Sequence, residues 1–165
     1  MPVRFYREED LTRIYEIEKL AHGNDGAPDH IIKSAIDDGD CLVFSYDDFD
    51  GGATHIEGFL IVQEKEISTK KLIDSEYTYD ELPYVWDIAV NPEFHGNGWG
   101  TLLLKSFENI FCKDSNQAWL LVSSENRAYN LYHSLGYRAN GFVRDYYREG
   151  QHAIIMVKDK TVAKK

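Results

Sequence analysis

The stretch that decides the fold is residues 84–101, Tyr-Val-Trp-Asp-Ile-Ala-Val-Asn-Pro-Glu-Phe-His-Gly-Asn-Gly-Trp-Gly-Thr. Its apolar run, 85–90, predicts a buried strand. Asn91-Pro92 ends that strand, because proline has no N–H to donate to a sheet. Glycines then alternate at positions 96, 98 and 100, and apolar residues recur at helical spacing over 102–111. The sequence therefore predicts a strand, a glycine loop and a helix, in that order.

A glycine loop at the start of a helix is suited to a phosphate or pyrophosphate group. Several backbone N–H groups can point at one anion, with the positive end of the helix dipole behind them. The loop is not a Walker A motif, because Trp99-Gly100-Thr101 supplies no lysine. The glycine spacing also differs from the G-x-G-x-x-G fingerprint of dinucleotide-binding folds. From the glycines alone, a tight turn without a ligand stays an alternative.

The segment Ile88-Ala89-Val90-Asn91-Pro92, followed by His95-Gly96-Asn97-Gly98-Trp99-Gly100, resembles the acetyl-CoA-binding motif of the GNAT superfamily of N-acetyltransferases. In that family the loop reads Gln/Arg-x-x-Gly-x-Gly/Ala, and here His95 stands where glutamine or arginine is usual. The resemblance implies that acetyl-CoA is bound by the end of the strand and by the loop, namely by Ile88, Ala89, Val90, His95, Gly96, Asn97, Gly98, Trp99, Gly100 and Thr101.

A second segment resembles the same family. Residues 118–123 read as a strand, residues 128–135 carry an apolar helical stripe, and Gly136 stands where a helix-ending glycine belongs. The family pattern Asn-x-x-Ala-x-x-Leu-Tyr implies that Tyr132 donates a proton or hydrogen bond to the CoA sulfur; the alternative is a core aromatic residue. Glu125 occupies the usual place of the asparagine, and Asn126 follows it, so both are candidates for contacting CoA.

The C-terminal residues 144–156 resemble the closing hairpin of protein N-terminal acetyltransferases, most of all the ribosomal-protein alanine N-acetyltransferases. Residues 17–22 are similar to theirs too, whereas 45–82 match poorly. The resemblance leads us to expect Tyr84, Tyr146 and Tyr147 to line the acceptor groove. In a regular strand, the last two would point to opposite faces.

The general base is not obvious from the sequence. In the related enzymes a Glu or His on the second motif strand often takes this role, and here that position falls on Leu120, which cannot titrate. Asp87 is the main candidate, because apolar neighbours are expected to raise the pKa of its carboxyl. Alternatively, Asp87 is a hydrogen-bonding partner for a loop, or Glu125 is the base.

Bulk properties narrow the function classes. The net charge of −10 argues against nonspecific nucleic-acid binding and allows attraction of cationic acceptors, although solvated acidic loops are the simpler interpretation. Cys41 and Cys112 have no metal-ligand spacing and are expected to be buried thiols. Three isolated histidines, His30, His133 and His152, suggest no metal site. Without an apolar run of membrane length or a signal peptide, we expect a cytoplasmic protein.

The expected architecture is an α/β layered domain over residues 1–160, with a disordered tail at 161–165. Strands are expected at 3–6, 41–46 and 57–63, helices at 8–22 and 29–36, and a loop at 65–82. The family resemblance implies a mixed, mostly antiparallel sheet, with a splayed V between two parallel strands and helices on both faces. We expect a monomer or homodimer.

The leading interpretation is an acetyl-CoA-dependent N-acetyltransferase that acts on the α-amine of a peptide or protein. One alternative is an enzyme for a small amine, such as a polyamine, amino sugar or amino acid. Another is a catalytically weak acyl-CoA-binding module that regulates a partner. Acetylation assays with peptides and polyamines separate these three interpretations.

Overall fold

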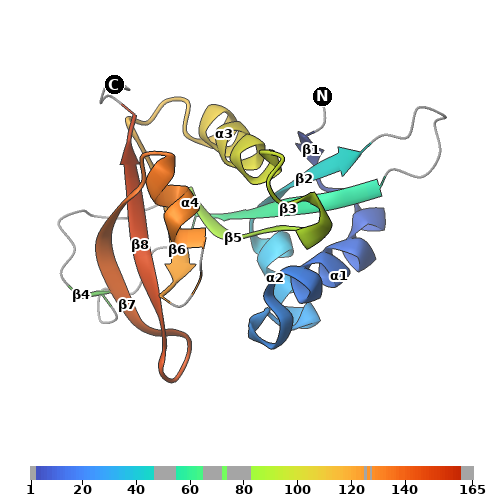
Figure 1. Cartoon of the computed structure of the whole chain (residues 1–165), viewed down its shortest axis with the longest axis horizontal. Helices are drawn as coiled ribbons and strands as arrows, with labels where there is room; N and C mark the ends of the chain where they lie inside the picture. The colour runs from blue at the N-terminus through green and yellow to red at the C-terminus, as the bar shows by residue number, and fades with distance from the viewer. Residues whose placement is uncertain are drawn as a thin grey trace. The chain divides into compact units, whose positions relative to one another are not determined.

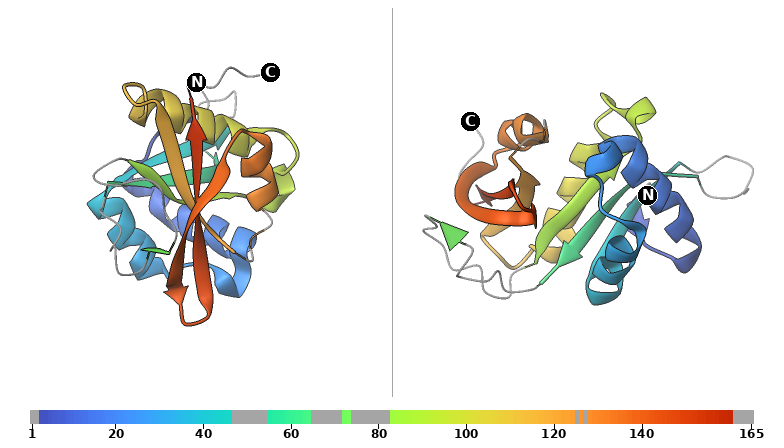
Figure 2. Two further views of the ribbon diagram at one scale, coloured as in Figure 1. Left: turned by 90° about the vertical axis from the view of Figure 1, so that its left-hand side faces the viewer. Right: turned by 90° about the horizontal axis from the view of Figure 1, so that it is seen from below.

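A computed structural model of the chain describes residues 3–46, 55–64, 72–73, 83–124, 126 and 128–160. Its residues group into two compact units. The first unit comprises residues 1–63 and 87–110, and the second comprises residues 64–86 and 111–165. Figure 1 shows the elements of both, and Figure 2 gives two further views. Strand β5 (Tyr84–Val90) contributes its last four residues to the first unit and its first three to the second.

The first unit is built around strands in the order β1-β2-β3-β5. Strands β1 (Val3–Phe5), β2 (Asp40–Tyr46) and β3 (His55–Gln63) pair antiparallel, and all three overlap the strand ranges expected from the sequence. Every residue of β3 after His55 is buried, because helices cover both faces of the strands. Helices α1 (Leu11–His22) and α2 (Asp29–Asp38) lie on one side and α3 (Trp99–Phe111) on the other (Figure 1).

The second unit is a sheet in the order β5-β6-β8-β7-β4. Strand β6 (Gln117–Ser123) pairs antiparallel with β8 (Gln151–Asp159), which pairs antiparallel with β7 (Arg138–Arg148). The β7–β8 hairpin is strongly twisted (Figure 2). The short helix α4 (Ala128–Ser134) ends just before Gly136, as predicted, and the φ of 100° at Gly136 suits glycine.

The expected mixed sheet is confirmed. Strands β5 and β6 run parallel, and the other ladders described above are antiparallel. The parallel ladder joins only Tyr84 to Trp119 and Val85 to Leu120, at the first residues of β5. The remaining residues of β5 therefore leave this ladder, as the expected splay requires.

The outcomes for the expected loop 65–82 and for the two cysteines differ. Inside the expected loop 65–82, Leu72–Ile73 form the two-residue strand β4, which pairs with β7. That part of the loop prediction is wrong, and most of the segment lies outside the described residues. Cys41 and Cys112 are buried free thiols, as predicted. None of the described helices is long and apolar enough to cross a membrane.

Candidate active site

The glycine loop has the backbone conformation that its sequence predicts. Gly96 and Gly98 adopt φ angles of 82° and 81°, and the space where a Cβ would stand is open at both. An L-amino acid is strained in this region of backbone space, so glycine is required for conformation rather than for close packing. Both glycines are exposed. The backbone of the loop is therefore accessible at both glycines.

Helix α3 begins directly after Gly98, whose carbonyl accepts the first helical hydrogen bond from Leu102 N at 3.0 Å. The N–H groups of the first helical turn, from Trp99 to Thr101, have no carbonyl one turn earlier in the helix to bond. They lie at the positive end of the helix dipole. This end of α3 therefore offers backbone N–H donors of the kind that bind anions.

The segment before the glycines is closed by hydrogen bonds. Asn91 bonds to Glu57 twice, from its backbone N to Glu57 O at 2.8 Å and from Nδ2 to Glu57 Oε2 at 2.8 Å. Its Oδ1 accepts from Glu93 N at 3.2 Å, and His95 Nε2 lies 2.8 Å from Val90 O. These bonds fix where β5 ends and where the loop begins.

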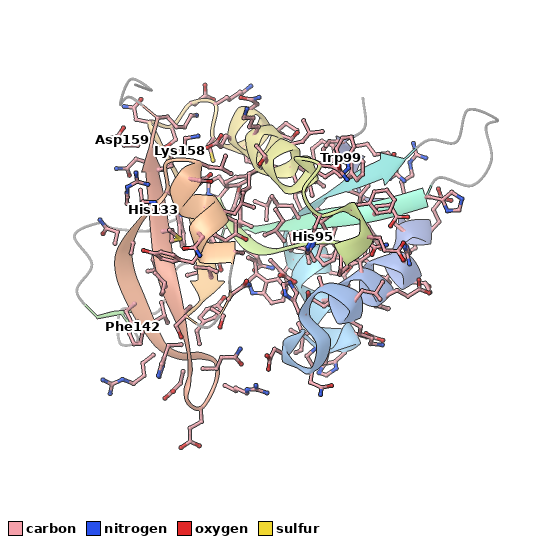
Figure 3. The ribbon with its side chains drawn as sticks, viewed as in Figure 1. His95, Trp99, His133, Phe142, Lys158 and Asp159 are labelled. Carbon is pink, nitrogen blue, oxygen red and sulfur yellow. The ribbon has the colours of Figure 1, made fainter. Side chains whose placement is uncertain are left out.

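Two residues assigned to CoA also have structural roles that the sequence did not reveal. His95 holds the loop to the end of β5 through its bond with Val90 O. The Trp99 ring stacks on Phe44 of β2, with ring centres 4.2 Å apart, so it fastens the start of α3 to the first unit. Figure 3 labels both residues. Their expected CoA contacts, and those of Ile88, Ala89, Asn97, Gly100 and Thr101, stay predictions.

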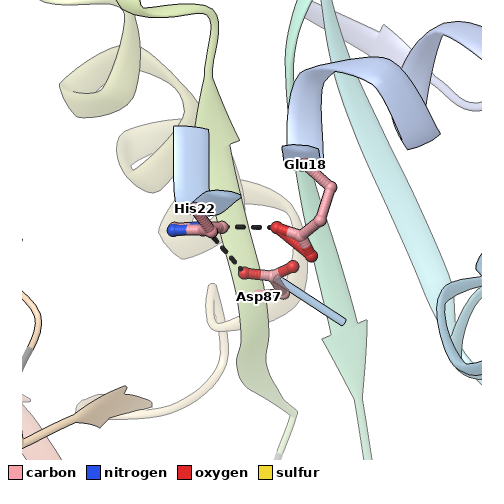
Figure 4. Close-up of side chains that lie close together, drawn as sticks. All are labelled: Glu18, His22 and Asp87. Atoms are coloured by element: carbon pink, nitrogen blue, oxygen red, sulfur yellow. Dashed lines mark ion pairs between the residues drawn. The ribbon is translucent and has the colours of Figure 1, made fainter. Parts of the chain in front are cut away.

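A cluster of three titratable side chains lies in the first unit beside β5 (Figure 4). Glu18 and His22 are one turn apart on α1, and Asp87 is the fourth residue of β5. His22 Nε2 lies 3.2 Å from Glu18 Oε1 and 3.6 Å from Asp87 Oδ1. The side chain of Glu18 is 2% exposed, whereas those of His22 and Asp87 are 23% and 19% exposed. The cluster is therefore anchored in the core and open at one side.

The three groups shift each other's ionisation. Burial raises the pKa of Glu18 far above its ordinary value, and the neighbouring charge of Asp87 raises it further. Burial also acts against the charge of Asp87, but hydrogen bonds with His22 and Glu18 outweigh it and lower its pKa. The pKa of His22 is raised, because its bond with Asp87 outweighs the opposing effect of burial. The expected rise in the pKa of Asp87 is wrong, since the sequence did not reveal the two polar partners of this carboxyl.

Stability should therefore depend on pH through Glu18. The folded state holds a proton on Glu18 that the unfolded chain releases above about pH 4.3, so stability falls as pH rises above that value. His22 acts in the same direction as pH passes its raised pKa, and the Asp87 contribution is constant above about pH 4. We expect Glu18→Gln to flatten the slope by up to about 1.4 kcal/mol per pH unit.

Urea unfolding between pH 5 and pH 8 measures this slope for the wild type and for Glu18→Gln. The variant should be the more stable protein at pH 8, and its advantage should grow with pH. Glu16→Gln is the matched control, because Glu16 lies on the same helix but is 56% exposed. Equal slopes for all three proteins would show that Glu18 ionises normally in the folded state.

Tyr132 lies in the second unit on α4 and is 4% exposed. Its ring meets the edge of Tyr137, with centres 6.4 Å apart, so packing accounts for part of its role. Asn126 Oδ1 accepts a hydrogen bond from Ala128 N at 2.9 Å and so caps the first turn of α4. Glu125 lies outside the described residues. The proposed contacts of these residues with CoA stay predictions.

Two of the tyrosines expected in the acceptor groove lie together in the second unit. Tyr84 is 3% exposed and stacks on Trp119, with ring centres 4.2 Å apart. Tyr146 packs against the same cluster and hydrogen-bonds to Tyr84. Tyr84 is therefore mainly a core residue, and Tyr146 is its partly exposed neighbour. The side chain of Tyr147 lies outside the described part of the molecule.

Glu18 and His22 are the two site residues that the sequence analysis missed. A signal was present, because Glu18 follows Ile14 by four residues and so falls on the apolar stripe of α1. A carboxylate on such a stripe requires a polar partner inside the protein. Asp87 is that partner, but 69 residues separate the two in the chain, and the sequence does not show that they meet.

Comparison with known proteins identifies the family. Residues 39–139 match the family model described as Acetyltransferase (GNAT) domain, and the chain belongs to the GNAT acetyltransferases. It is 34% identical over 84 residues to an uncharacterized N-acetyltransferase of Methanocaldococcus jannaschii. That match covers 49% of this chain and 54% of the relative, so the chain spans about half the length of the curated protein it matches.

Solved structures with the same fold cover nearly the whole chain. The ribosomal-protein-S18-alanine N-acetyltransferase of Escherichia coli has a TM-score of 0.68 and 23% identity, covering 99% of this chain and 96% of that one. Naa20 of Chaetomium thermophilum, solved with a bisubstrate analogue, has a TM-score of 0.72 and 22% identity, covering 96% and 86%. At these identities the likeness establishes the fold.

Proposed function

We propose that this chain is an acetyl-CoA-dependent N-acetyltransferase whose acceptor is the α-amine of a peptide or protein. The observation that carries the proposal is the open glycine loop at the start of α3, within a GNAT domain. Backbone N–H groups of the loop and of the first helical turn bind the pyrophosphate of the coenzyme. The end of β5 leads directly into this loop and holds the acetyl end.

The cluster of Glu18, His22 and Asp87 favours an α-amine over a more basic amine. An ammonium group is not a nucleophile, so the acceptor must lose a proton before it attacks the thioester carbon. Free α-amines titrate near about 8, and lysine-type amines near about 10.4. The cluster beside β5 offers a histidine with a raised pKa and a carboxylate with a lowered one. These groups are matched to the α-ammonium, which is the stronger of the two acids.

One further observation supports a peptide acceptor, and a second is compatible with any cationic acceptor. The enzyme for the alanine of ribosomal protein S18 and Naa20 share the fold over most of their lengths. The net charge of −10 attracts cationic acceptors to the surface. In our proposal Tyr146, beside the buried Tyr84, contacts the peptide chain, and Tyr132 gives a proton to the departing CoA sulfur.

The experiment is mass-spectrometric detection of acetylation across a panel of free-amine peptides, the same peptides with blocked N-termini, polyamines and amino sugars. We expect acetylated free-amine peptides, no reaction at blocked ones, and rates that fall with added salt, because surface attraction is screened over about 10 Å at 0.1 M. Exclusive acetylation of a small amine would replace the peptide proposal with the small-amine one. Tight acetyl-CoA binding without turnover on any amine would support the regulatory module.

Tyr132→Phe tests the proposed proton donor. Phenylalanine keeps the ring that packs against Tyr137 and removes only the hydroxyl. General acid help is typically worth about 10²-fold or more in rate, so kcat should fall by about that factor with little change in acetyl-CoA affinity or thermal stability. Steady-state kinetics and a thermal melt measure the three quantities. A variant with unchanged kcat would make Tyr132 a core residue only.

A further inference from the structure

The Nε2 atom of His22 faces oxygen atoms on three sides. Glu18 Oε1 lies at 3.2 Å, the carbonyl oxygen of Ile88 at 3.3 Å and Asp87 Oδ1 at 3.6 Å. A ring nitrogen among acceptor oxygens carries the hydrogen. In the neutral imidazole the lone pair then lies on the other nitrogen, Nδ1. The surroundings of His22 thus select one tautomer.

The Nδ1 atom is the side of His22 that is available for chemistry. Every hydrogen bond and ion pair of His22 with the described residues involves Nε2. Figure 4 shows a ring nitrogen directed away from both carboxylates, while the dashed lines to them leave the ring at its opposite end. Nδ1 is absent from the buried polar atoms that have no partner, and 23% of the side chain is exposed. The lone pair therefore reaches solvent.

We propose that His22 is the general base of this enzyme, with Asp87 and Glu18 as the positioning residues that orient it. This inference rests on the proposed acetyl transfer. The contact with the Ile88 carbonyl places the ring against β5, the strand that leads into the glycine loop. A base held by a carboxylate at one ring nitrogen and free to accept at the other is the arrangement that general-base catalysis by histidine uses.

The reaction step balances with these groups. The acceptor ammonium gives one proton to His22 Nδ1, directly or through one water, and becomes a neutral amine. The amine nitrogen attacks the thioester carbon, so a C–N bond forms as the C–S bond breaks. The nitrogen then loses its second proton to solvent, and the CoA sulfur gains one from Tyr132. His22 releases its proton to solvent, and Tyr132 takes one back from solvent. The sum is one amide, one free thiol of CoA and one proton released to solvent.

Three acidic groups face His22, and two of them, Asp87 and Asp25, raise its pKa. Glu18 contacts it from α1 and Asp87 from β5, and Asp25 of the short helix η2 (Gly23–Asp25) acts through its charge. Burial opposes the charged ring, but the bond with Asp87 raises the pKa of His22 overall. A raised pKa brings the base closer to the α-amine that it must deprotonate, and the efficiency of proton transfer follows this match.

The same three side chains have the donor set of a divalent cation site, with one ligand atom from each within 4.8 Å of the others. A metal ion would need the Nε2 lone pair, and that atom is within hydrogen-bond distance of the Ile88 carbonyl as well as of Glu18 Oε1. It would also need both carboxylates ionised, whereas burial favours a protonated Glu18. The observations therefore favour the proton acceptor, and metal binding is an outcome of the test.

The test compares His22→Gln with the wild type over pH 6 to 9. The glutamine Nε2 can donate to the same oxygens but offers no basic nitrogen, so the structural bonds are kept and the base is lost. We expect kcat to fall about 10²-fold or more, KM for acetyl-CoA to stay within about twofold, and the limb of the pH profile that belongs to His22 to disappear. His30→Gln is the matched control, because His30 is exposed on α2.

A second variant, His22→Ala, keeps the proposal falsifiable if glutamine disturbs the fold. Added imidazole should restore part of its activity, which a purely structural histidine would not allow. Full kcat and an unchanged pH limb in His22→Gln would overturn the proposal. So would one equivalent of Zn²⁺ or Mn²⁺ bound by the wild type, lost in His22→Gln and required for turnover.

These measurements distinguish failure of the peptide-acceptor proposal from failure of the His22 proposal. The His22 measurements use whichever amine the wild type acetylates best, so a preference for a small amine changes the acceptor but not the test of the base. A wild type that binds acetyl-CoA but acetylates no amine would overturn both.

Discussion

Gly98→Asp is expected to lose nearly all affinity for coenzyme A while the protein stays folded. The substitution puts a negative side chain at the position where we propose that the loop receives a pyrophosphate. Two unit charges about 4 Å apart repel by about 4 kcal/mol at the effective dielectric constant of a protein surface. Such a penalty raises Kd about 10³-fold. Isothermal titration calorimetry measures the affinity, and a thermal melt confirms the fold.

The matched control for Gly98→Asp is Gly150→Asp. Gly150 lies in the β7–β8 turn and adopts a φ of 79°, close to the 81° of Gly98, and the space for a Cβ is open at both. The two variants therefore share the backbone strain but not the ligand site. Gly98→Ala separates the added charge from the added carbon. Unchanged CoA affinity in a folded Gly98→Asp variant would show that this loop does not bind the coenzyme.

Asp87→Asn should lower kcat by about 10²-fold or more. Asparagine fits the same space but removes the charge that holds His22, so both the orientation and the basicity of the ring are reduced. Because the bond with Asp87 is what raises the pKa of His22, the pH limb should move to lower pH in the variant. Asp114→Asn is the control, since Asp114 is an exposed residue of the second unit.

The pH profile of Asp87→Asn distinguishes three roles. A limb that moves supports Asp87 as the positioning residue of His22. A limb that vanishes would make Asp87 itself the base. An unchanged limb with normal kcat and lower thermal stability would reduce Asp87 to a structural partner of α1.

The glycine loop could be predicted from the sequence because each of its features is local. Proline ends a strand, glycine permits a positive φ, and apolar residues at helical spacing indicate α3, all within residues 84–111. Strands β2 and β3 and the end of α4 just before Gly136 could be predicted for the same reason. Strand β4 was not, because the pairing of two residues with β7 leaves no periodic pattern.

The acid–base cluster could be predicted only in part. Asp87 was selected from its apolar neighbours, but the direction of its pKa depends on Glu18 and His22, which come from a different element. The faces of Tyr146 and Tyr147 could not be predicted from alternation either. Asp145 adopts a φ of 52°, and the register of β7 against β8 shifts between Val143 and Arg148, so the regular alternation of a strand does not hold there.

The bonds that close the segment from Asn91 to His95 have a thermodynamic consequence for coenzyme binding. Because this part of the loop is already held by Glu57 and by the Val90 carbonyl, a bound ligand does not have to order it. Ordering a chain on binding costs conformational entropy, and a preorganised site avoids most of that cost. The affinity for the diphosphate thus depends on β3, through a buried glutamate that lies 39 residues before the first loop glycine.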